Sequence, residues 1–187
     1  HYAESIKRNR ESQALYRISR ALAEGGSFQQ KASRVAEELL GVSEADLVAF
    51  RIPHRTQETL ELVASAGAFD PPPANIPFDT YAVGKAFESG ETIIENDYSS
   101  HPDATPDYVF AGFKSALAMP VKFDEQVIGV IVYGSLNSDH FTEPRVTLLA
   151  TVANVLGPLF QTAISAEELA VSDEFARIIT STLDIEE

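Results

Sequence analysis

The stretch SALAMPVKFDEQVIGVIVYGS, residues 115–135, decides the fold. It contains two apolar segments, 115–123 and 127–135, on either side of the polar turn Asp124-Glu125-Gln126. Two apolar segments of strand length joined by so short a turn predict an antiparallel β-hairpin. This hairpin is the clearest structural signal in the chain, and the other elements are interpreted around it.

Upstream of the hairpin, a second pair of strands is predicted at 47–52 and 59–66, joined by the turn 53–57. A short helix is expected at 81–88, ending at Gly90, with a short strand at 92–94. The segment 96–114 has no regular pattern but is rich in aromatic residues, and we expect a binding loop or lid there.

Helical periodicity marks the rest of the chain. A helix is predicted at 3–24, and a second one runs from an N-cap at Ser27 to a stop at Gly41. The last helix opens at Thr142 and extends past residue 170, with Gly157-Pro158 as an expected interruption. Its apolar residues repeat about every 3.5 positions, which predicts a parallel homodimer through a coiled-coil-like seam: Leu148, Val152, Val155, Leu159, Ala163, Ala166 and Leu169.

This order of elements predicts an α+β fold with an antiparallel sheet. We divide the chain into a linker or signalling helix (1–26), one globular domain (27–165) and a C-terminal linker helix (166–187). The last residues, 175–187, echo the pattern of residues 15–22, which suggests the start of a second domain.

Three stretches taken together resemble the GAF domain family. The first, 84–97, has a helix end, a glycine, a short strand and an aspartate in the family's order. The second is the hairpin, whose Ser115-to-Val121 and Val127-to-Ile131 segments look like the family's "S-x-L-x-V-P-L … I-G-V-L" pattern. The third is the helix entry Phe141-Thr142-Glu143. The resemblance covers about residues 27–163.

The resemblance implies a GAF/PAS-like sheet of five or six strands, with the terminal helices on one face and a short helix plus loops on the other. Family members bind small molecules beneath that second cover or act as ligand-free dimerisation scaffolds. They sit upstream of histidine kinases, cyclases, phosphodiesterases and transcription activators. We therefore expect a non-catalytic, cytoplasmic sensory domain of a signalling protein, with a histidine kinase as the expected output and ligand-free signal relay as the alternative.

Composition excludes several functions. The 28 acidic and 14 basic residues give a formal charge of −14, which disfavours nucleic acid and anionic membranes as partners. The chain has no cysteine, so a covalently attached bilin and the cysteine-dependent methionine-sulfoxide reductase branch of the family are excluded. We expect no membrane insertion, because apolar runs are short.

Catalytic and metal motifs are weak. None of the four histidines has a metal-ligand spacing, and Ser99, Ser100, His101 and Asp103 lack a nucleophile elbow. The family's cyclic-nucleotide pattern is matched only at Asn137 and Phe141. We therefore predict no catalytic residue and leave any cofactor unknown, with His140 as a structural residue.

An apolar ligand pocket is the remaining candidate site, with Arg51 and Ser115 as possible polar groups. The alternative is that these aromatic residues form only core. The candidate ligand-binding residues are Phe50, Phe78, Tyr81, Tyr98, His101, Tyr108, Phe110, Phe113, Ser115 and Tyr133.

Overall fold

A computed structural model describes residues 1–54, 56–71 and 74–183. Its centre is a six-stranded antiparallel sheet with the strand order β3-β2-β1-β6-β5-β4. The strands are β1 (Leu47–His54), β2 (Thr59–Gly67), β3 (Ile76–Pro77), β4 (Ile93–Glu95), β5 (Ser115–Phe123) and β6 (Gln126–Ser135). The predicted α+β class and antiparallel sheet are confirmed.

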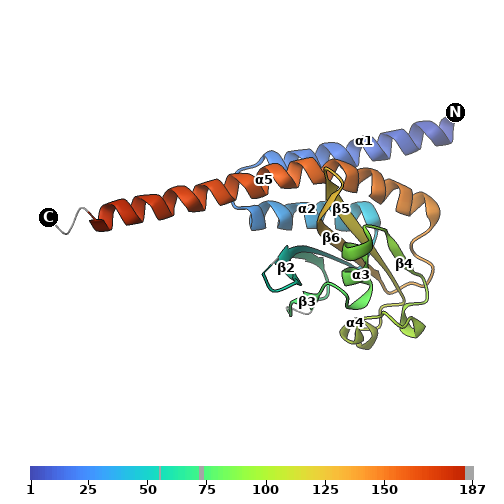
Figure 1. Cartoon of the computed structure of the whole chain (residues 1–187). Coiled ribbons are helices and arrows are strands. Elements are labelled where there is room, and N and C mark those ends of the chain that lie inside the picture. The colour runs from blue at the N-terminus through green and yellow to red at the C-terminus, as the bar shows by residue number, and fades with distance from the viewer. Residues whose placement is uncertain (55, 72–73, 184–187) are drawn as a thin grey trace.

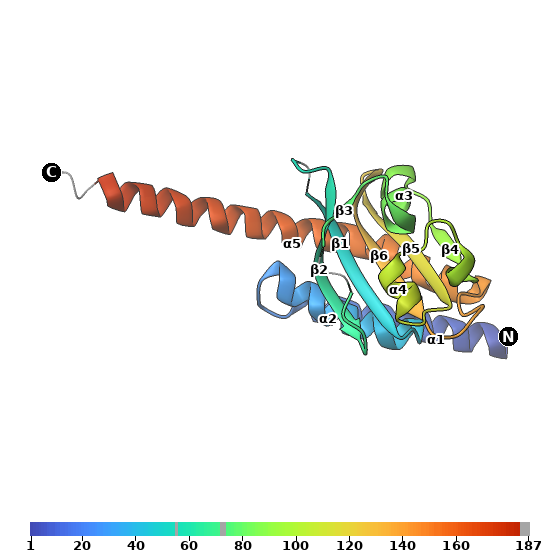
Figure 2. The ribbon, with the colours of Figure 1, turned by 90° about the horizontal axis from the view of Figure 1, so that it is seen from below.

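Helices cover both faces of this sheet (Figure 1). The long helices α1 (Tyr2–Ala23), α2 (Phe28–Ser43) and α5 (Glu143–Leu183) form a layer on one face. The short helices α3 (Tyr81–Ser89) and α4 (Pro106–Phe110), with the 3₁₀ turn η1 (Tyr98–Ser100), cover the other face (Figure 2). The expected segregation of terminal helices and short cover is therefore confirmed.

The β5–β6 hairpin turns on two residues rather than three. Asp124 and Glu125 both have positive φ, 48° and 64°, which suits the right-handed twist of the flanking strands. Gln126, expected in the turn, instead pairs with Phe123 as the first residue of β6. The register shifts once, between Val121 and Lys122.

Alternation along the hairpin divides the core in two. Leu117, Met119 and Ile131 pack against the long helices. Ala116, Ala118 and Val132 lie in the second cluster, beneath α3 and α4. The side chains on the cover side of β5 are small, which lets the short helices approach the sheet closely.

Two expected helix ends differ from the structure. Helix α2 continues through Gly41 to Ser43 and ends at Glu44, whose φ is 52°. Gly41 needs no unusual backbone there, so it does not stop the helix. Helix α5 also continues through Gly157 and Pro158. Gly157 serves close packing instead: a Cβ atom at this position would lie 1.8 Å from the Lys122 carbonyl oxygen on β5.

Segment 96–114 is more ordered than predicted, because it contains η1 and α4. Pro106 opens α4, where a missing N–H costs nothing. The Tyr98 N–H donates to the Lys114 carbonyl, and the Ala82 N–H on α3 donates to the Asp103 carbonyl. These bonds fix the segment as a cover over β4, β5 and β6.

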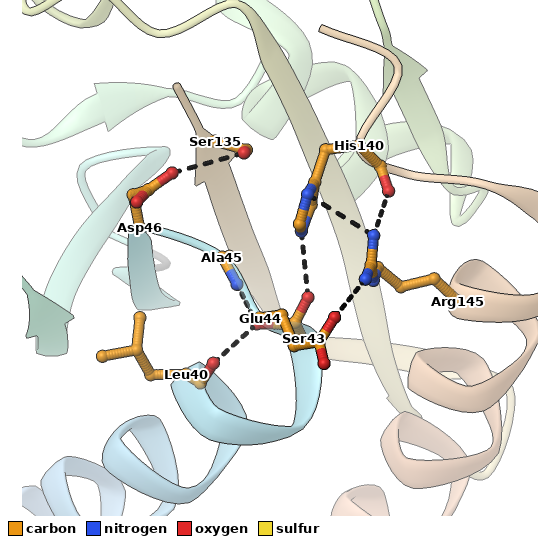
Figure 3. Close-up of polar contacts among 8 residues, drawn as sticks. All are labelled: Leu40, Ser43, Glu44, Ala45, Asp46, Ser135, His140 and Arg145. Carbon is orange, nitrogen blue, oxygen red and sulfur yellow. Dashed lines mark hydrogen bonds and ion pairs between the residues drawn. The ribbon is translucent and has the colours of Figure 1, made fainter. Parts of the chain in front are cut away.

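A polar network joins the end of α2 to the start of α5 (Figure 3). Arg145 donates to the His140 carbonyl at 2.6 Å and pairs with Glu44, while His140 Nε2 lies 3.0 Å from the Ser43 carbonyl. The Asp46 carboxylate accepts from the Leu136 N–H at 2.8 Å. His140 is structural, as predicted, and the network ties α5 to the sheet.

Only part of the predicted α5 seam is exposed. Val152 and Ala163 lie in the core, whereas Val155 and Leu169 face outward. The intramolecular stripe is Leu149, Val152, Ala153, Leu156 and Phe160, because this face meets the sheet and the other long helices.

Beyond the body of the domain, α5 projects as a free helix (Figure 1). The proposed boundary between residues 165 and 166 falls inside this helix, and residues 184–187 of the echoed segment lie outside the described residues. The stretch Glu143–Ser181 meets the length and hydropathy of a membrane-spanning helix, a test that core helices of soluble proteins also pass.

Candidate functional site

A small enclosed chamber lies between the sheet and its short-helix cover. The centre of a water-sized group can occupy about 20 Å³ of it, which is room for about one water molecule. Strands β1, β3, β4, β5 and β6 form its floor and walls, and α3, η1 and the start of α4 close it. The lining is Arg51, Ile76, Ala82, Val83, Ile93, Glu95, Tyr98, Thr105, Tyr108, Ala116, Leu117, Ala118 and Val132. We call this space the chamber.

Arg51 enters the chamber because side chains alternate along β1: Phe50 faces the long helices, and Arg51 faces the cover. The bulge at this point lies in β2, where Val63 is the extra residue between Leu62 and Ala64, the partners of Arg51 and Phe50. The guanidinium is 1% exposed and donates to the carbonyls of Leu60 (3.3 Å) and Ala74 (3.1 Å). Burial lowers the pKa of Arg51, and Tyr108 beside it opposes this shift.

Glu95, the last residue of β4, is 2% exposed. His101 Nδ1 lies 2.8 Å from Glu95 Oε1, but the same nitrogen accepts a hydrogen bond from the Asp103 N–H at 3.2 Å. Among the described residues neither carboxylate oxygen of Glu95 has a hydrogen-bond donor. Burial raises the pKa of Glu95; His101 and Lys85 work against this rise, and Asp103 adds to it.

Two tyrosines complete the polar lining. Tyr98 Oη accepts from the Thr105 N–H at 2.7 Å, which fixes the ring under the cover. Tyr108 lies beside Arg51 and packs edge-on against Phe113 with ring centroids 5.5 Å apart. Burial raises the pKa of each tyrosine to about 12, so both hydroxyls stay protonated at neutral pH.

An ion pair closes the rim of the chamber. Lys85 Nζ on α3 lies 2.6 Å from Asp103 Oδ1, in the link between η1 and α4. The His101 side chain, one third exposed, stands between Glu95 and solvent. Lys85–Asp103 and His101–Glu95 are thus two side-chain contacts of the cover near Glu95.

The structure brings together only some of the predicted ligand residues. Tyr98 and Tyr108 line the chamber, and His101 stands at its rim. Phe113 packs on Tyr108, and the partly buried Phe78 and Tyr81 pack against the same cluster beneath the cover.

Four predicted residues lie elsewhere. Phe50 and Tyr133 point to the long helices, because strand alternation places them on the opposite face. Phe110 is 95% exposed at the end of α4. Ser115 is buried and donates to the Asn137 carbonyl at 2.7 Å, so it fixes the end of the hairpin.

Sequence reasoning missed Glu95. The available signal was its spacing from Ile93, because residues two apart on a strand share a face. Within the described ranges no group of three or more histidine, aspartate or glutamate side chains is arranged to hold a metal ion.

Fold and chamber together define the class: an α+β domain with a long-helix layer on one side of the sheet and a covered chamber on the other. The family model for the GAF domain matches residues 27–161. The chain belongs to the GAF domain family. No curated protein sequence matches it at a significant level.

Solved structures agree on the fold. The GAF domain of an Acinetobacter phosphoenolpyruvate-protein phosphotransferase has a TM-score of 0.73 and 18% identity, over 84% of this chain and 97% of that one. The corresponding domain from Coxiella burnetii has a TM-score of 0.74 and 20% identity, over 83% and 95%. Free methionine-R-sulfoxide reductase from Neisseria meningitidis, solved with its substrate, has a TM-score of 0.73 and 22% identity, over 83% and 91%. At these identities the likeness establishes the fold alone.

Proposed function

We propose that this GAF domain is a non-catalytic sensor that binds a small molecule in the chamber and passes the change to an output domain through α5. The observation that carries the proposal is the pair of buried charged residues, Arg51 and Glu95, in the wall of one chamber. A few fixed polar groups within an apolar lining are typical of small-molecule sites.

Energetics favours binding over a purely structural role for these groups. A buried polar group without a hydrogen bond costs about 1–3 kcal/mol, and a charged group costs more. An apolar residue at position 95 would avoid that cost if the cover served only to fill space. A ligand that donates a hydrogen bond to Glu95 would offset the cost only in the bound state, which couples binding to the stability of the cover.

Strand β5 offers a route from the chamber to α5. Ala116 and Ala118 face the chamber side, while Leu117 and Met119 face the long helices. Further along β5, the Lys122 carbonyl abuts Gly157 of α5. Packed interfaces transmit small shifts because they do not deform continuously. A shift of β5 on ligand binding would therefore displace α5.

For the output we propose a homodimer that forms through the terminal helices and transmits the signal to a domain such as a histidine kinase. We place this dimer in the cytoplasm, with neither membrane insertion nor nucleic-acid binding. A groove of about 560 Å³ lies between the start of α2 and the projecting part of α5. Its α5 wall includes the exposed Val171, Phe175 and Ile178, on which a second helix can pack.

A ligand-free dimerisation and relay scaffold is the second candidate. The observation in its favour is the chamber volume of about 20 Å³, which excludes most metabolites unless the cover moves. Under this alternative the chamber polar groups only position the cover, and signals arrive through α1.

Native mass spectrometry of the purified chain, under gentle and then denaturing conditions, separates the two. We expect a small molecule that is retained in the gentle spectrum and lost on denaturation. Ala118→Val, which adds two methyl groups to the chamber wall, should abolish that retention, with circular dichroism and urea denaturation as the check that the fold is kept. An apo mass for the wild-type chain, with added metabolite extract also leaving no adduct, would support the scaffold.

A further inference from the structure

Among the described residues, the buried carboxylate of Glu95 has a close contact with His101 but no hydrogen-bond donor. Its side chain has no exposed surface, and both oxygens lack a hydrogen-bond donor among the described residues. His101 Nδ1 is close, at 2.8 Å, but it is already the acceptor for the Asp103 N–H. A buried carboxylate of this kind attracts a cationic donor.

The free space fits one small group. The chamber volume of about 20 Å³ accepts a single water-sized group, and an ammonium group is of that size. The aromatic side chains of Tyr98 and Tyr108 share the lining, and aromatic rings attract cations. The positive Arg51 donates to the carbonyls of Leu60 and Ala74 and not to Glu95.

We infer that Glu95 binds the ammonium group of a small primary-amine ligand in the chamber, an inference that rests on the proposed function. The head group occupies the free volume and donates to the carboxylate oxygens. The remainder of the ligand extends toward solvent past His101. In the bound state the His101 side chain turns outward from its position between Glu95 and solvent.

The ligand competes with His101 for Glu95. The charged and titratable groups around this carboxylate are His101, Asp103 and Lys85 at the rim, and Tyr98, Tyr108 and Arg51 in the chamber. A proton on Glu95 opposes an ammonium ligand, and burial raises the pKa of Glu95 above its ordinary value. Binding therefore strengthens as the pH rises through this raised pKa, while the amine keeps its own proton.

The test uses three two-carbon probes on the whole 187-residue chain: ethylammonium chloride, ethanol and sodium acetate, at matched ionic strength. Amide chemical shifts by NMR report binding at the chamber residues. We expect ethylammonium to give saturable shifts at Glu95, Tyr98 and His101 that ethanol and acetate do not give. Glu95→Gln, which keeps the shape and removes the charge, should weaken this binding by about tenfold or more.

Glu91→Gln is the matched control, because Glu91 is an exposed carboxylate just before β4. It should bind ethylammonium as the wild type does. Equal shifts with acetate or ethanol, or unchanged ethylammonium affinity in Glu95→Gln, would overturn the charge assignment and leave the proposed function standing. No chamber shift with any probe, together with an apo native mass, would overturn both.

Discussion

At the residue scale, the main feature is a carboxylate that is buried without a hydrogen-bond donor in the described part of the chain. Glu95 sits beneath a cover held by short helices, and His101 Nδ1, 2.8 Å from its carboxylate, also accepts a hydrogen bond from the Asp103 N–H. Desolvation disfavours the charged carboxylate, which is why its pKa lies above the ordinary value. This residue therefore links the pH, the stability of the domain and the proposed ligand.

The raised pKa of Glu95 predicts how stability depends on pH. Above the ordinary carboxyl pKa of 4.5, the native state holds a proton on Glu95 that the unfolded chain releases. The contribution of Glu95 to the free energy of unfolding is thus largest below that value and is lost as the pH rises through the raised pKa. Urea denaturation of wild type and Glu95→Gln should show the variant gaining relative stability with rising pH.

The matched variant for this experiment is again Glu91→Gln, whose stability difference from wild type should not follow the same pH course. A constant difference between wild type and Glu95→Gln from about pH 4 to about pH 8 would contradict the assigned desolvation of Glu95.

At the element scale, close packing of a helix on a strand decides where glycine is required. Gly157 lies in α5 and Gly41 in α2, so both occupy helix interiors. A Cβ at Gly157 would meet the Lys122 carbonyl, whereas a Cβ at Gly41 would meet nothing within 4 Å. The same residue type therefore has opposite roles in two helices.

Alanine substitutions test this difference. Gly157→Ala should lower the free energy of unfolding by about 2–3 kcal/mol, because β5 or α5 must shift to admit the methyl group. Gly41→Ala should raise it by about 0.5–1 kcal/mol, because alanine favours the helix. Chemical denaturation of both variants measures the effect, and equal effects of one sign would refute the assigned contact.

At the scale of the whole molecule, α5 couples two regions. Its first half packs on the sheet, and its second half leaves the domain with apolar side chains exposed (Figure 1). Phe175 is 66% exposed on the same stripe as Val171 and Ile178. An exposed apolar stripe on a projecting helix is typical of an interaction surface.

We predict that Phe175→Glu weakens self-association by about tenfold or more, since it places a charge in the apolar stripe. Thr180→Glu, one turn further along α5 and rotated by about 140° from Phe175, should leave association unchanged. Sedimentation velocity across a concentration series measures both variants. A wild-type chain that stays monomeric at the highest concentration would remove the basis for the dimer.

The sequence by itself determined the fold class, the hairpin 115–135, the long terminal helices and the GAF family. These depend on periodicity and turn chemistry within short windows, which the local sequence encodes. The sequence did not determine that α2 continues through Gly41, or that α5 continues through Gly157 and Pro158. Packing against neighbouring elements stabilises these helical turns.

Only the tertiary structure decided the composition of the chamber. The place of β1 in the sheet turns the Phe50 ring to the long helices and the next residue, Arg51, into the chamber, and Glu95 lies on the chamber side of β4. Residues 51, 95 and 108 are far apart in the chain and meet only when the sheet and its cover assemble. The aromatic pattern indicated the cover, but the charged groups of the chamber depend on register and on long-range packing, which no local pattern records.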